Sequence, residues 1–136
     1  MGLKQRKAVK SLEDNLFPSL KKEVLDTLGF EIEVEVLWDS LAKTENVSSY
    51  EDGFEKVYFV PVIEALKEIG ADDMGKEALQ ESLKKIVIKD ENEIYSYTQW
   101  SSFEDGILTL DHQIGVNHDD FKSRKKQLQK MLEDAL

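Results

Sequence analysis

The 136-residue sequence contains no cysteine, two prolines and seven glycines. Without cysteine there are no disulfides, no thiolate nucleophiles, no iron–sulfur clusters and no zinc sites that need a thiolate ligand. No apolar run approaches the roughly 20 residues that a membrane-spanning helix needs. The stretch from Met1 to Lys10 is charged, which is unlike a signal peptide. We therefore expect a cytoplasmic protein that does not bind a membrane.

Sequence motifs of catalysis are also missing. There is no glycine-rich phosphate loop, no dinucleotide fingerprint, no Gly-x-Ser-x-Gly elbow and no His-Glu-x-x-His helix. The sequence therefore indicates no catalytic residue, no metal ligand and no cofactor. We expect a protein that is not an enzyme.

Basic residues are scarce in the middle of the chain. The whole sequence has 28 acids and 18 lysines and arginines, a net charge of -10. Gly29 to Val116 holds seven lysines, no arginine and twenty acids, which gives a local balance of -13 (7 minus 20), whereas both ends are mildly basic. Such a surface repels nucleic-acid phosphates and anionic lipids and favours a basic protein partner.

Hydrophobic periodicity predicts one α+β domain over residues 1–136, with helices packed on one face of an antiparallel or mixed sheet in the order α-β-αα-βββ-α. A helix is predicted over Leu3–Leu28, kinked or divided at Pro18. Phe30–Trp38 alternates apolar and acidic residues, as a strand does. Two helices should follow between Pro61 and Ile86, and a last helix should start at Asn117.

Three further strands are predicted at 86–89, 93–103 and 107–112. Asp105-Gly106 between the last two strands is a strong hairpin signal. A two-residue turn there puts Phe103 on the face of Leu108 and Leu110. Trp100 then falls on the opposite face, where we expect it to be accessible.

The predicted contact residues for a basic partner are acids and one aromatic. Glu31, Glu33 and Glu35 form a row on one face of the predicted strand, and Asp111 accompanies Trp100. Tryptophan is frequent at interface hot spots, and carboxylates pair with a partner's lysines and arginines. The simpler interpretation of the glutamates is a solvated face that protects a sheet edge.

The function that these features favour is a binding protein that neutralises or regulates a basic protein, in the manner of an immunity protein against a nuclease toxin or of a DNA mimic. One alternative is a metal-dependent enzyme or metal-binding protein that uses His112, His118 and nearby carboxylates. Asn117, Asp119 and Asp120 also fit a plain role at a helix start. A structural or oligomeric accessory domain is the third alternative.

A segment of the chain resembles a known family. Asp52-Gly53-Phe54-Glu55-Lys56-Val57-Tyr58-Phe59, followed by Glu64-Ala65-Leu66-Lys67-Glu68-Ile69-Gly70-Ala71-Asp72 and a second helix, is similar to a bacterial family of uncharacterised domains. That family has an acidic DNA-mimic protein among its members. The likeness extends from Asp52 to about Ile86, and it implies an acidic binding protein without assigning a role to any residue.

Overall fold

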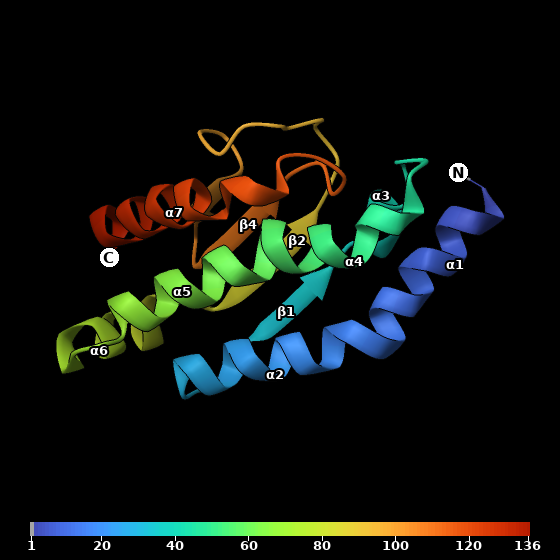
Figure 1. Ribbon diagram of the computed structural model, residues 1–136. Helices are drawn as coiled ribbons and strands as arrows, with labels where there is room; N and C mark the ends of the chain where they lie inside the picture. Colours follow the sequence, from blue (N-terminus) through green and yellow to red (C-terminus); the bar gives the residue numbers. More distant parts are fainter. Residues whose placement is uncertain (1) are drawn as a thin grey trace.

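The computed structural model of the protein describes residues 2–136 and has an α+β fold built on one mixed, four-stranded sheet (Figure 1). The order across the sheet is β1-β2-β4-β3, with β1, β2 and β4 parallel and β3 antiparallel to β4. The strands are β1 (Glu33–Val36), β2 (Lys85–Lys89), β3 (Ser101–Glu104) and β4 (Ile107–Asp111).

The N-terminal segment forms two helices joined by a π-helical turn. α1 (Leu3–Ser11) leads through Leu12–Leu16 into α2 (Phe17–Leu28). Pro18 lies in the first turn of α2, where its missing N–H costs little. Gly29 ends α2 in the left-handed region at φ 79°. The predicted division at Pro18 and stop at Gly29 are confirmed.

The middle of the chain is more helical than predicted. Phe54 to Val60, whose sequence pattern fits strand and helix alike, continues from α4 as a π-helical turn into α5. Asp72 begins α6 by accepting a hydrogen bond of 2.7 Å from the Gly75 N–H. The helices that complete the chain are α3 (Trp38–Leu41), α4 (Tyr50–Gly53), α5 (Val60–Ile69), α6 (Asp73–Ser82) and α7 (Phe121–Ala135).

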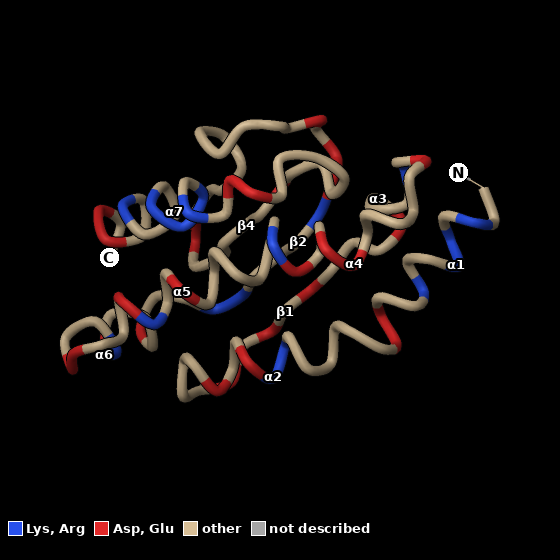
Figure 2. Tube along the Cα trace, viewed as in Figure 1, with Lys and Arg blue, Asp and Glu red and all other residues tan. Residues whose placement is uncertain are grey.

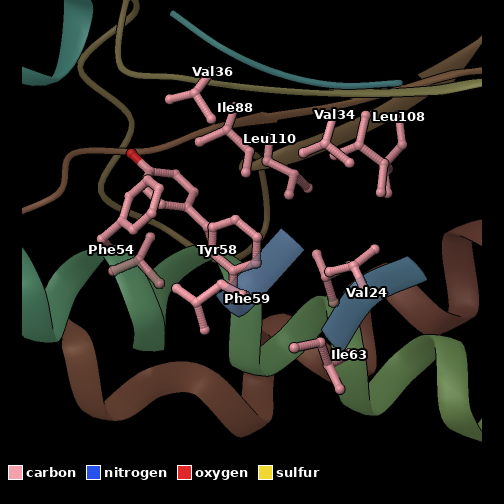
Figure 3. Close-up of a cluster of buried hydrophobic side chains, with 14 of the residues drawn as sticks. Val24, Val34, Val36, Phe54, Tyr58, Phe59, Ile63, Ile88, Leu108 and Leu110 are labelled. Atoms are coloured by element: carbon pink, nitrogen blue, oxygen red, sulfur yellow. The ribbon is translucent and has the colours of Figure 1, made fainter. Parts of the chain in front are cut away.

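The helices α2, α5 and α7 lie on one face of the sheet, as predicted for the fold class (Figure 1). Every second strand residue points toward them, and Figure 3 shows these side chains meeting those of α2, α5 and the π-helical turn before α5. The cluster includes Val24, Val34, Phe54, Tyr58, Phe59, Ile63, Ile88 and Leu110. No helix among residues 2–136 is long and apolar enough to cross a membrane.

Two strands are shorter than the alternation predicted. The strand expected over Phe30–Trp38 is limited to four residues, because only this stretch pairs with β2. The strand expected over 93–103 is limited to Ser101–Glu104. The hairpin is as expected: Glu104 faces Ile107, and Asp105 and Gly106 take φ values of 54° and 80°.

Candidate functional site

Among residues 2–136, no helix or further strand covers the face of the sheet opposite α2, α5 and α7, and we call this face the open face. The strand register aligns its residues into two rows that cross all four strands. The rows are Glu33–Lys85–Ile107–Glu104 and Glu35–Val87–Thr109–Ser102. The side chain of Ile107 is 37% exposed, and the glutamates at both edges are exposed. The open face therefore has an apolar centre with acidic borders.

The β1 glutamates lie where the alternation predicted them. Glu31, Glu33 and Glu35 are all exposed. The Lys85 ammonium lies 3.2 Å from a Glu33 carboxylate oxygen and 3.0 Å from one of Glu35. The hydrogen bonds that the Lys85 ammonium donates to the carboxylates of Glu35 and, next, Glu33 raise the pKa of Lys85. One lysine therefore forms ion pairs with two carboxylates, and the three glutamates together keep an excess of negative charge.

The other mid-chain acids do not gather into one patch. Figure 2 shows acidic residues spread over α2, α4, α5, α6 and the loops, whereas lysines and arginine gather along α7. Of the acids that were predicted to contact a partner, only the glutamates of β1 and the one just before it lie together in a row. The candidate site is therefore the open face with its β1 border, and not the whole acidic surface.

The predicted accessibility of Trp100 and Asp111 is wrong. The side chain of Trp100 is 0% exposed and that of Asp111 is buried. The Asp111 carboxylate accepts hydrogen bonds from the Glu91 N–H at 3.0 Å and from the Asn92 side-chain amide at 2.5 Å. The loop 90–99 therefore closes over this end of the open face. Alternation along a strand assigns a side chain to a face, but it does not reveal a loop that covers that face.

Two accessible aromatic residues lie on this loop instead. The side chains of Tyr95 and Tyr97 are 51% and 41% exposed. The Tyr95 carbonyl accepts a hydrogen bond of 2.6 Å from the Asn117 side chain, so the loop is anchored beside Tyr95. Sequence reasoning missed these tyrosines because it assigned them to a strand. The surrounding serine, threonine and glutamine residues were the signal for a loop.

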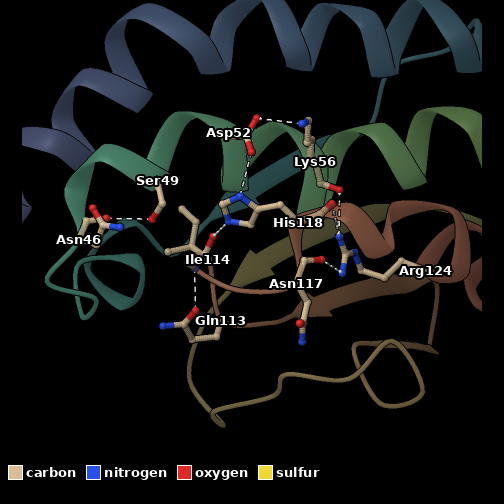
Figure 4. A network of polar contacts seen from close by, with 10 residues as sticks. Asn46, Ser49, Asp52, Lys56, Gln113, Ile114, Asn117, His118 and Arg124 are labelled. Carbon is tan, nitrogen blue, oxygen red and sulfur yellow. Dashed lines mark hydrogen bonds and ion pairs between the residues drawn. The ribbon is translucent and has the colours of Figure 1, made fainter.

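The two histidines do not converge on a metal site. Both ring nitrogens of His118 already face oxygen atoms, those of Asp52 at 2.9 Å and of the Ile114 carbonyl at 2.8 Å (Figure 4). His112 is fully buried, and burial lowers its pKa. Within residues 2–136, no group of three or more histidines and carboxylates is arranged to hold a metal ion. The contacts of His118 instead tie α4 to the segment before α7.

The start of α7 differs from the predicted cap. Asn117 precedes a short 3-10 turn at φ 56°, and its side chain bonds to the loop rather than to the helix. Arg124 is buried and donates to the carbonyl oxygens of Asn117 at 2.8 Å and His118 at 3.1 Å (Figure 4). Its guanidinium holds the turn from inside through these two carbonyl oxygens.

Asp90, at the end of β2, is a buried carboxylic acid without a partner. Its backbone N–H donates to Ser40 Oγ at 3.0 Å, and its carbonyl oxygen accepts from Lys43 Nζ at 2.6 Å. Neither carboxyl oxygen has a hydrogen-bond partner among residues 2–136. Burial raises the pKa of Asp90 to about 6. Asp90 lies between the strands predicted at 86–89 and 93–103, and the sequence pattern did not indicate its burial.

Comparison with known proteins finds no relative of the chain. No protein-family model matches the sequence, and no curated protein or solved structure matches it significantly. The resemblance of residues 52–86 to a family of uncharacterised bacterial domains therefore stays a prediction.

Proposed function

We propose that the protein is a non-enzymatic binding protein whose open face binds a basic protein partner and so neutralises or regulates it. The observation that carries the proposal is the uncovered face of three parallel strands. Parallel sheets are almost always covered on both faces. Here the second face has no covering layer, so a partner would supply the layer that the chain itself lacks.

Charge supports a basic partner. The acids on and beside the open face outnumber its two lysines, Lys85 and Lys89. These acids are Glu31, Glu33, Glu35, Glu91 and Glu104. Lys89 lies 2.9 Å from Glu91 and Lys85 is held by two glutamates, so both lysines are already neutralised. Exposed carboxylates at a rim act chiefly by steering an oppositely charged partner and setting its orientation.

The centre of the face supports a protein partner rather than free cations. Ile107 and Val87 form a small apolar patch, exposed and half-buried respectively, beside the half-buried Thr109 and between the acidic borders. An apolar centre with a polar rim is the usual anatomy of a protein interface. Tyr95 and Tyr97, on the loop at the end of the strands, replace Trp100 as the aromatic residues that a partner can reach.

The proposal is tested by capture at low salt with two variants of equal charge. Glu33→Gln/Glu35→Gln removes two acids from the open face, and Glu77→Gln/Glu81→Gln removes two exposed acids from α6. Immobilised protein is exposed to a lysate of the organism that encodes the chain and eluted with a salt gradient. We expect a basic protein to be retained by the wild type and the α6 variant and lost from the open-face variant. Equal retention by all three would contradict the proposal.

A further inference from the structure

A hollow between α5 and α7 has the size of a small-molecule site. Its volume is about 410 Å³, and small-molecule sites span roughly 300–1,000 Å³. Val60 and Pro61 of α5 and Phe121 of α7 give it an apolar lining. The remaining lining residues are charged: Glu64, Lys122, Lys125 and Lys126. The hollow is far from the open face in the fold, because α5 and α7 cover the other side of the sheet.

We call this hollow the α5–α7 groove. The three lysines that line it differ in whether they have an ion-pair partner. Lys125 Nζ lies 2.6 Å from a Glu68 carboxylate oxygen, so its charge is already compensated. Within residues 2–136, no carboxylate lies within 4.0 Å of the ammonium group of Lys122 or Lys126. These two residues are four apart on α7 and so lie on one face of the helix. In a protein of net charge -10, two uncompensated lysines beside an apolar hollow form a local site for an anion.

The other charges limit which anion fits. Glu64 lies on the α5 side of the hollow, and its carboxylate oxygen is 3.8 Å from Lys67 Nζ. This carboxylate repels a second negative charge on a ligand. A monocarboxylate therefore suits the groove better than a phosphate dianion. An anionic membrane is disfavoured by the net charge. A stable protein interface uses roughly 20–30 residues a side, whereas seven residues line this hollow.

We propose that the α5–α7 groove binds a small organic acid. The apolar body of this ligand lies against Phe121, Val60 and Pro61. Its carboxylate lies between the ammonium groups of Lys122 and Lys126. This site is separate from the open face, so it does not depend on the function proposed above.

The test uses the purified full chain and 1-naphthoate as the probe, followed by amide chemical shifts. We expect saturable shifts confined to the residues around Val60, Phe121, Lys122 and Lys126. The neutral analogue 1-naphthalenemethanol and the dianionic 1-naphthyl phosphate should both bind more weakly. Shifts elsewhere on the molecule, or equal binding of the neutral analogue, would overturn the proposal. Tighter binding of the phosphate would overturn the assignment to a carboxylate.

Variants separate the lysine pair from general charge. Lys122→Gln/Lys126→Gln should weaken 1-naphthoate binding roughly tenfold, since contacts to a charged group are worth about 1.5 kcal/mol or more. Lys4→Gln/Lys7→Gln removes two exposed lysines from α1 and serves as the matched control. It should bind like the wild type. An equal loss in both variants would show that net charge, and not the groove, attracts the probe.

Discussion

Replacement of Asp90 by asparagine should change the pH dependence of stability. Burial is the main cause of the raised pKa of Asp90; Lys43 and the backbone N–H of Ile114 oppose it, while Asp111 and Glu93 add to it. Because neither carboxyl oxygen has a hydrogen-bond partner within 3.5 Å, ionisation leaves a poorly compensated charge in the interior. Asparagine has nearly the same shape and no charge. The substitution therefore isolates the cost of that charge.

The pKa values give the size and sign of the effect. Asp90 has a pKa of about 6 in the folded protein against an ordinary value of 3.8. The folded state therefore holds its proton more tightly, and this contribution to stability is lost as pH rises from 3.8 through 6. The difference between these two pKa values corresponds to about 3 kcal/mol in the free energy of unfolding. Any cost of the unpaired amide in Asp90→Asn is independent of pH, so it cancels when two pH values are compared.

The assay is urea unfolding of wild type and Asp90→Asn at pH 4 and pH 8. We expect the free energy of unfolding of the variant, relative to wild type, to be about 2.4 kcal/mol higher at pH 8 than at pH 4, because at pH 4 the unfolded chain is already partly ionised at this residue. Other titrating groups, including buried His112, whose pKa is lowered, are common to both proteins and drop out. A difference that does not change with pH would refute the assignment of an unpaired acid to Asp90.

Two further outcomes test the packing. Gly53→Ala should lower the free energy of unfolding by about 3 kcal/mol, because its Cβ would collide with the Ile114 carbonyl oxygen. Gly29→Ala, which meets no atom within 4 Å but keeps φ at 79°, should cost only about 1 kcal/mol; similar losses in urea titrations would contradict this difference. In a Trp38→Phe variant, Trp100 fluorescence should resist quenching by acrylamide, and ready quenching would contradict the complete burial of Trp100.

Local signals in the sequence predicted the local structure well. The Asp105-Gly106 turn and its register followed from a dipeptide that tolerates positive φ. The spacing of Leu20, Val24 and Leu28 predicted the buried face of α2. These features depend on residues that are close in the chain, so periodicity and turn chemistry are sufficient to find them.

Features that depend on distant residues were not predictable in this way. The parallel pairing of β1 with β2 brings together segments about fifty residues apart. The burial of Asp111 depends on the loop 90–99, whose Glu91 N–H and Asn92 amide donate to its carboxylate, and the burial of Trp100 was likewise not evident from alternation. The row from Glu31 to Glu35 was found because alternation fixes which side chains share a face. The pairing of Lys85 with two of these glutamates was not predicted, because it depends on the register between β1 and β2.

The most direct test of the proposed docking surface is a titration of the isotopically labelled protein with a lysine-rich peptide at low salt. We expect the largest amide shifts on β1 and β2 of the open face, around Glu33, Glu35 and Val87, and we expect added salt to abolish them. The Glu33→Gln/Glu35→Gln variant should lose these shifts. Shifts centred on α6, or shifts of equal size over every acidic segment, would contradict a specific acidic docking surface on the sheet.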